Sequence, residues 1–173
     1  MPTTQMQKEN PVSPKQQFVE WYRREVQTTL RVLRALPATA VELRPHGKAK
    51  TARELAWIFV AEQSILAAAL KGPLSLGKPF PPAPKNYHEI VTQFEQSAAA
   101  LEKSLRDLPD ADLNRTVEFM AGPGKTAMYQ ILDLAQFMLC DQIHHRGQLS
   151  VYLRMAEGKV PSIYGPSLDE PWN

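Results

Sequence analysis

The chain has 173 residues, of which 43% are hydrophobic and 22% are charged, and 20 basic against 18 acidic residues leave a formal net charge of +2. This length and composition are typical of one globular domain and exclude a strongly basic nucleic-acid-binding chain. No run of Lys and Arg is interleaved with aromatic residues, so we expect no nucleic-acid partner. No stretch of about 18 uncharged apolar residues exists, so we expect no membrane-spanning helix.

The N-terminal segment is polar and offers nothing to bury. We therefore predict a disordered tail over residues 1–13 and a folded domain over residues 14–173. Ser13 followed by Pro14 predicts the start of a first helix, whose apolar residues recur at helical spacing until about Leu36. The N-terminal segment lacks the apolar stretch that a secretory signal peptide contains. Cys140 is the only cysteine, so no disulfide can form within the chain, and we expect a cytoplasmic protein.

Two further helices are predicted in the middle of the chain. Thr51, with Glu54 three residues later, predicts a capping box at the start of a second helix that ends at Gly72. Residues 72–85 contain five prolines and two glycines, which favours an extended loop. Asn86 can cap a third helix, which we expect to end near Leu108.

The last third of the chain predicts one more long helix. Residues 110–125 suit a short extended segment and a Gly-Pro-Gly turn, and we expect the fourth helix to run from Thr126 to about Gly158. The tail that follows is rich in Pro and Gly and should pack across the outside. Four helices with almost no alternating strand pattern predict an all-α protein, a four-helix bundle.

A heptad reading of the fourth helix places polar residues inside its apolar face. Asp141 and His145 are four residues apart, so their side chains can reach a shared atom. The predicted face turns polar at these positions and contains Ile131, Leu134, Met138, Asp141, His145, Gln148 and Tyr152.

The second helix carries a carboxylate on its own apolar face. Glu62 lies among Leu55, Phe59 and Leu66, and an unpaired buried carboxylate is costly. If the second helix packs beside the fourth, a polar pocket forms in the bundle core from Glu62, Asp141, His145 and Gln148. The alternative is a polar core without metal, in which the Asp141 carboxylate bonds to His145 or Arg146.

Three other residues of the predicted fourth helix each have a structural and a functional interpretation. Arg146 could orient the pocket or bind the tail carboxylates of Asp169 and Glu170. Cys140 is more typical of a buried small apolar residue than of a nucleophile. Gly147 and its small neighbours would let the first helix, or a second copy of the protein, come close.

Three segments of the chain resemble a known family. The run HHRGQLSVYLR, the tail GKVPSIYGPSLDE and the segment TARELAWIFVAEQ are similar to the DinB / YfiT-like four-helix-bundle proteins. The resemblance implies an up-down-down-up bundle that is frequently a homodimer. It also implies a divalent metal, commonly nickel or zinc, held by three histidines, and in some members a thiol S-transferase activity on small-molecule substrates.

The family's histidine pattern is incomplete in this chain. The last histidine of the family's H-x-x-x-H pair corresponds to His145, but the first corresponds to Asp141 and the histidine of the second helix to Ile58. Glu62 could replace the missing histidine of the second helix, although Glu62 lies one turn beyond Ile58, about 5.4 Å along the helix axis.

These departures favour a metal site that is absent or weak, with Glu62, Asp141 and His145 as its only candidate ligands. We therefore expect a non-catalytic ligand-binding or interaction protein with a degraded metal triad. The alternative is a metal-dependent enzyme, a thiol S-transferase or hydrolase, that uses a divalent ion bound by histidine and carboxylates.

Overall fold

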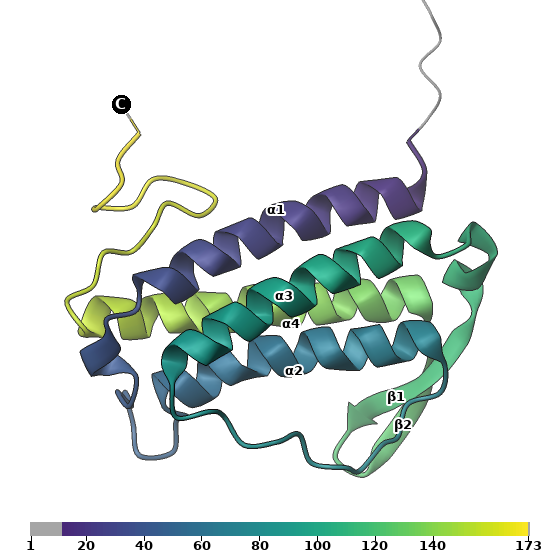
Figure 1. The fold of residues 1–173 in the computed structure, drawn as a ribbon, viewed down its shortest axis with the longest axis horizontal. Helices are drawn as coiled ribbons and strands as arrows, with labels where there is room; N and C mark the ends of the chain where they lie inside the picture. The colour runs from purple at the N-terminus through teal and green to yellow at the C-terminus, as the bar shows by residue number, and fades with distance from the viewer. Residues whose placement is uncertain (1–11, 173) are drawn as a thin grey trace, which may run out of the picture.

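The computed structural model describes residues 12–172, so most of the predicted N-terminal tail lies outside the described residues. The predicted four-helix bundle is confirmed (Figure 1). Within residues 12–172, no helix combines the length and the hydropathy that crossing a bilayer requires. The long helices are α1 (Pro14–Ala35), α2 (Ala52–Lys71), α3 (Tyr87–Asp107) and α4 (Ile131–Met155).

The helices follow an up-down-down-up order. In Figure 1, α1 and α4 run in one direction along the bundle while α2 and α3 run in the other. The extensive helix contacts are those of α1 with α3 and α4, and of α2 with α3 and α4, so α2 and α4 are antiparallel neighbours. Since α2 and α3 are parallel, residues 72–86 must return along the whole bundle, which explains why this connection is long and extended (Figure 1).

The helix starts follow the predicted caps. The hydroxyl of Ser13 accepts a hydrogen bond from the Gln16 amide, and that of Thr51 accepts one from the Glu54 amide, each within a complete capping box. The Asn86 side chain accepts a bond from the amide of His88 at the start of α3. Local sequence therefore decides where these three helices begin.

The proline-rich connection is held against α2 by side-chain donors. The indole of Trp57 donates to the carbonyl of Pro81 at 2.7 Å. The guanidinium of Arg53 donates to the carbonyls of Ala83 and Pro84 at 3.0 and 3.2 Å. These bonds satisfy carbonyls that have no helical or strand partner, so the loop has a defined path.

A β-hairpin precedes α4, and it corrects the predicted start of that helix. Strands β1 (Thr116–Gly122) and β2 (Lys125–Gln130) pair antiparallel. The fourth helix therefore begins at Ile131, and the prediction that it begins at Thr126 was wrong. Pairing with β1 overrides the helical spacing of residues 126–130, and the turn is allowed by positive φ at Gly122 and Gly124.

Two short 3-10 helices, η1 (Ala38–Ala40) and η2 (Asp110–Asn114), complete the fold. Two contacts hold the hairpin that follows η2 against the bundle. The guanidinium of Arg115 donates to the carbonyls of Ala69 and Leu70 at the end of α2, each at 2.9 Å. The ring of Phe119 packs on that of Phe137 in α4, with centroids 6.5 Å apart.

A buried ion pair joins α1, α4 and the C-terminal tail. Arg146 is only 1% exposed, and its Nη1 lies 2.7 Å from Oε2 of the buried Glu25. Nη1 also donates to the hydroxyl of Thr29, and Nη2 donates to the hydroxyl of Tyr164 at 2.7 Å. The Tyr164 hydroxyl in turn donates to Oε2 of Glu25 at 2.8 Å. The tail is thereby fastened across the outside, as predicted.

The partners of Arg146 differ from the predicted ones. Asp169 pairs with Arg154 at 2.6 Å, and Glu170 pairs with Arg31, so neither acid binds Arg146. Arg146 lies on the side of α4 that faces α1, so its guanidinium cannot reach the two acids at the surface. Sequence spacing places Arg146 on this helix but does not show which neighbour it faces.

We expect Arg146→Met to destabilise the fold by about 3–5 kcal/mol, because it leaves the carboxylate of Glu25 buried without its cation. Arg154→Met is the matched control, since the exposed pair of Arg154 with Asp169 should contribute no more than about 1 kcal/mol. Denaturant unfolding monitored by circular dichroism measures both. Adding Glu25→Met to Arg146→Met should recover part of the loss, and an Arg146→Met loss as small as that of the control would contradict the assignment.

Candidate functional site

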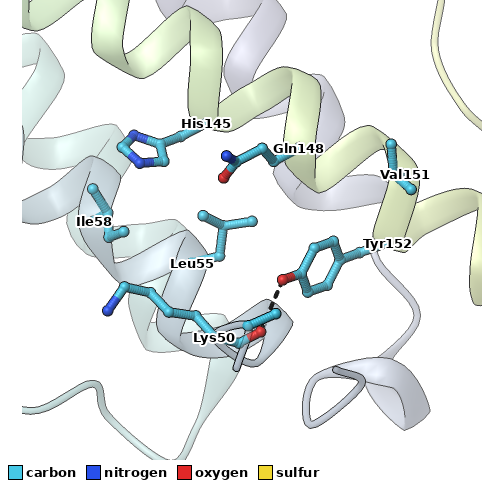
Figure 2. A pocket seen from close by; sticks show the side chains of 8 residues that line it. Lys50, Leu55, Ile58, His145, Gln148, Val151 and Tyr152 are labelled. Atoms are coloured by element: carbon cyan, nitrogen blue, oxygen red, sulfur yellow. Dashed lines mark hydrogen bonds between the residues drawn. The ribbon is translucent and has the colours of Figure 1, made fainter. Parts of the chain in front are cut away.

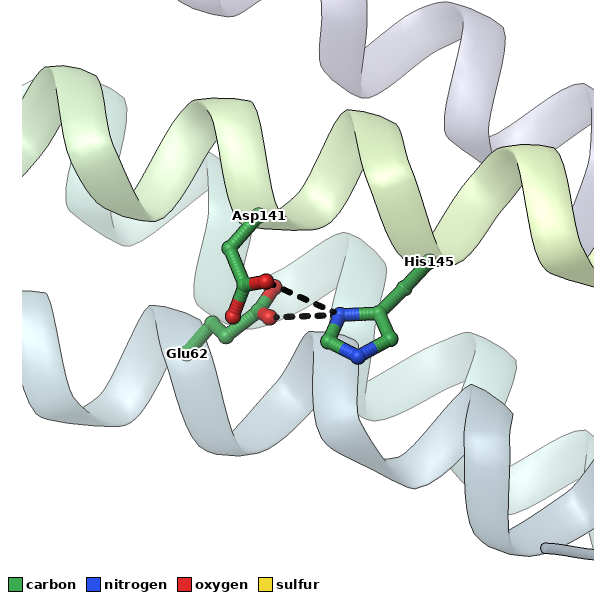
Figure 3. Close-up of side chains that lie close together, drawn as sticks. All are labelled: Glu62, Asp141 and His145. Carbon is green, nitrogen blue, oxygen red and sulfur yellow. Dashed lines mark hydrogen bonds and ion pairs between the residues drawn. The ribbon is translucent and has the colours of Figure 1, made fainter. Parts of the chain in front are cut away.

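Three side chains from α2 and α4 meet inside the bundle (Figure 3). The Nδ1 atom of His145 lies 3.2 Å from Oε1 of Glu62 and 3.7 Å from Oδ1 of Asp141. One oxygen or nitrogen of each residue lies within 4.8 Å of the others. The structure thus brings together the three residues that the sequence predicted as candidate metal ligands.

The direction of the Glu62 side chain explains how it reaches this cluster. Helical side chains lean toward the N-terminus of their helix, so a long residue covers surface that lies before its own position. Figure 3 shows the carboxylate of Glu62 pointing along α2 toward the ring of His145. The one-turn offset between Ile58 and Glu62 is therefore reduced by the length of the glutamate side chain.

One carboxylate oxygen of the cluster has no protein partner. Glu62 is 5% exposed, and its Oε1 bonds to His145. Among the described residues, no donor reaches its Oε2, and the same holds for Oε1 of the buried Gln142. Both residues border a small cavity of about 10 Å³, which is close to the size that holds one water. A buried oxygen without a partner is costly, so Glu62 Oε2 requires a proton, a water or a cation.

The buried carboxylate and the imidazole influence each other's protonation. Burial raises the pKa of Glu62 from 4.5 to about 7, although the hydrogen bond with His145 opposes the rise. The hydrogen bond to Glu62 raises the pKa of His145, against the effect of its own burial. The pair therefore retains a shared proton near neutral pH. A metal ion would displace that proton, because metal ligands bind in their deprotonated forms.

A cavity of about 390 Å³ opens beside the cluster, between α2 and α4 (Figure 2). His145 belongs to both the cluster and the cavity wall, so it connects the carboxylates of Glu62 and Asp141 to the space that a small molecule could enter. The cavity is of the size that binds small ligands. Its walls are formed by Ala49, Lys50, Leu55, Ile58, His145, Gln148, Val151 and Tyr152.

Asp141 and His145 approach Glu62, and Gln148 lines the cavity beside His145 but lies outside the cluster. Gln148 is exposed at the cavity wall, and its Nε2 lies 2.9 Å from Nε2 of His144 rather than in the cluster. The buried polar positions of α4 are instead Gln142 and Arg146. The helix is buried against both α1 and α2, so its buried arc is wider than one heptad stripe.

Two residues near the cluster have environments that the sequence did not reveal. Cys140 is exposed, contrary to the expectation of a buried position. Ile58, at the position of the family's helix-two histidine, is partly buried and forms part of the cavity wall. Gln142 was missed because glutamine lies on the polar faces of most helices, and no spacing in the sequence distinguishes this one.

The model of the DinB family matches residues 4–172. The uncharacterized protein YrdA of Bacillus subtilis is 25% identical over 154 residues, which cover 88% of this chain and 89% of YrdA. The family match covers the bundle, the hairpin and the tail, so it concerns the whole described fold.

Solved structures share the same architecture. A DinB-like protein of Bacillus cereus ATCC 10987 superposes with a TM-score of 0.72 at 21% identity, covering 85% of this chain and 95% of that protein. YfiT of Bacillus subtilis, described as a probable metal-dependent hydrolase with an unusual four-helix bundle topology, superposes with a TM-score of 0.67 at 11% identity, covering 88% and 94%. At these identities the likeness establishes the fold alone.

We expect the metal-free protein to lose stability as the pH rises from 5 to 8. The pKa of Glu62 is raised in the folded state, so its stabilising contribution is complete below the unfolded value near 4.5 and is lost through about 7. The raised pKa of His145 acts in the same direction. Denaturant unfolding at both pH values should show roughly 1–3 kcal/mol more loss in the wild type than in Glu62→Gln.

Glu89→Gln, at an exposed glutamate of α3, is the matched control and should follow the wild type. If the wild type and Glu62→Gln lose the same stability between pH 5 and pH 8, Glu62 does not carry the shared proton.

Proposed function

The chain belongs to the DinB family, and we propose that it binds a divalent metal ion through Glu62, Asp141 and His145. The observation that carries the proposal is the buried Glu62 Oε2, which has no donor among the described residues although it lies beside two other metal-ligating side chains. A cation at the cluster would compensate this oxygen and both carboxylate charges. Two carboxylates and one imidazole suit iron, manganese or zinc.

The spacing of the three side chains is compatible with one ion. Oxygen and nitrogen ligands lie about 2.0–2.2 Å from zinc, so two ligands of one ion are about 3–3.5 Å apart. The separations from Nδ1 of His145 to the two carboxylates, 3.2 and 3.7 Å, are close to this range. Modest movements of the Asp141 side chain, which is partly exposed, would complete the set.

We further propose that the site serves a metal-dependent hydrolysis of a small molecule bound in the cavity of about 390 Å³. When bound, a divalent ion supplies Lewis-acid polarisation of a substrate oxygen. Glu62 and His145 would give up their shared proton on metal binding, so in the loaded site they would act as ligands rather than as acid or base. The side chains of Leu55, Ile58 and Val151 give the cavity wall an apolar part against which the body of a substrate could pack.

A non-catalytic binding protein is the competing proposal, and Ile58 favours it. An aliphatic side chain stands where the family resemblance places a nitrogen ligand, and a proton shared between Glu62 Oε1 and His145 can take the place of a cation. In that case the cavity binds its ligand without metal. Ligand binding that is unchanged after chelation would separate this function from a hydrolase or a thiol S-transferase.

Metal content of the purified, untagged protein tests the proposal. We expect about one divalent ion per chain by mass spectrometry, and a metal affinity at least about 100-fold lower in Glu62→Gln and His145→Ala, because each removes a direct ligand. His144→Ala is the matched control, since this exposed neighbouring histidine is outside the cluster and should keep the metal.

Chelation gives a second measurement in the same experiment. An ion that binds only the folded state adds about 2.7 kcal/mol at a concentration 100 times its Kd, so chelator should lower the melting temperature of the wild type but not of His145→Ala. Protein that holds no metal after addition of zinc, manganese or iron, and whose melting is indifferent to chelator, would overturn the metal proposal.

The homodimer expected from the family resemblance is also a proposal. Phe137 and Met155 are exposed on the same face of α4, and apolar residues gathered on one helix face are typical of subunit contacts. Sedimentation velocity should show a dimer that Met155→Glu dissociates, while Met128→Glu on the exposed hairpin should leave it unchanged. A wild-type monomer at every concentration tested would contradict this assembly.

A further inference from the structure

A second hollow adjoins the cavity beside His145. It has a volume of about 560 Å³ and lies between α2 and the proline-rich connection, where the rings of Trp57 and Phe80 pack 5.3 Å apart. The two spaces share Lys50 and Ile58 in their walls, so they form one branched recess. Lys50 stands at the junction between them.

The backbone of Lys50 is fixed while its ammonium group is available. The hydroxyl of Tyr152 donates to the Lys50 carbonyl at 2.9 Å, which ties the residue to α4 (Figure 2). Figure 2 shows the Lys50 side chain extending beneath Leu55 and Ile58, across the cavity from His145. Among residues 12–172, no carboxylate forms an ion pair with its amino group.

The acidic residue nearest to Lys50 in the sequence, Glu54, already has other partners. The carboxylate of Glu54 accepts the backbone amide of Thr51 at 2.8 Å and lies 3.6 Å from a guanidinium nitrogen of Arg44. Its capping role holds it at the start of α2, where its ion pair among the described residues is with Arg44 and not with Lys50. The ammonium of Lys50 can therefore pair with a ligand.

The charges in the wall of the first cavity favour an anion once the metal proposed above is bound, and this step rests on that proposal. A divalent ion would cancel the charges of Glu62 and Asp141. Lys50 is then the only permanent charge in the wall of the first cavity, and the other side chains of that wall are mostly apolar. Without the ion, two carboxylates would oppose an anionic ligand.

We infer that the recess binds a small organic anion, with its carboxylate or phosphate group against Lys50 and its apolar body against Leu55, Ile58 and Val151. Lys50 determines the preference for a negative charge and belongs to ligand recognition rather than to the metal cluster. A cavity of about 390 Å³ accommodates a short chain or a single ring. The second hollow gives space for a longer substituent beside Trp57 and Phe80.

Calorimetric binding of four probes to the zinc-loaded, full-length protein tests the inference. The probes are hexanoate, hexyl phosphate, the neutral hexanamide and the cationic hexylammonium. We expect at least one anion to bind about tenfold more tightly than hexanamide, and hexylammonium to bind most weakly. The difference between hexanoate and hexyl phosphate identifies which anionic group the recess prefers.

Lys50→Met keeps the aliphatic stem and the backbone carbonyl that Tyr152 contacts, so it should fold normally. It should bind the preferred anion about tenfold more weakly, with zinc affinity and hexanamide binding unchanged. Lys50→Arg should restore the anion preference. Lys48→Met is the matched control, because this exposed lysine of the same loop lines neither space and should behave as the wild type.

Zinc-loaded wild type that binds hexanamide as tightly as both anions would overturn the inference and leave the metal site standing. The inference also fails if Lys50→Met retains the anion preference, since the charge would then come from elsewhere. If the protein binds no zinc when zinc is added, before any probe is tested, the metal proposal and the inference are overturned together.

Discussion

The contact between Glu62 and His145 across the interface of α2 and α4 is the constraint on which the site depends. A carboxylate that is 5% exposed must be compensated inside an apolar bundle, and the imidazole at 3.2 Å compensates only one of its oxygens. The antiparallel packing of α2 on α4 sets which residues face each other here. The unsatisfied Oε2 of Glu62 then distinguishes the cluster from an ordinary buried ion pair.

Neighbouring residues of α4 illustrate that distinction. Arg146 follows His145 directly but points about 100° away around the helix, toward α1. There Glu25, Thr29 and Tyr164 occupy its donors in a closed network, which is what a structural role requires. The cluster at His145 is incomplete and opens onto a cavity. A buried polar atom without a partner in a cluster that reaches a cavity makes the cluster a candidate functional site.

The order of the helices also shapes the recess. Because α2 and α3 run in the same direction, the connection between them must travel back along the bundle, and Trp57 and Arg53 hold it against α2. This path creates the second hollow and places the segment around Phe80 beside it. An up-down-up-down bundle with short turns would have neither the extended loop nor the space beneath it.

The sequence by itself determined the four helices, their caps at Ser13, Thr51 and Asn86, and the i, i+4 placement of Asp141 and His145, since these follow from local hydrogen bonding and helical periodicity. Only the tertiary structure decided the pairing of residues 125–130 as a strand, the burial of Arg146 against α1, the exposure of Gln148 and the approach of Glu62 to His145. These features depend on which helix faces which, and on long-range contacts that no local spacing encodes.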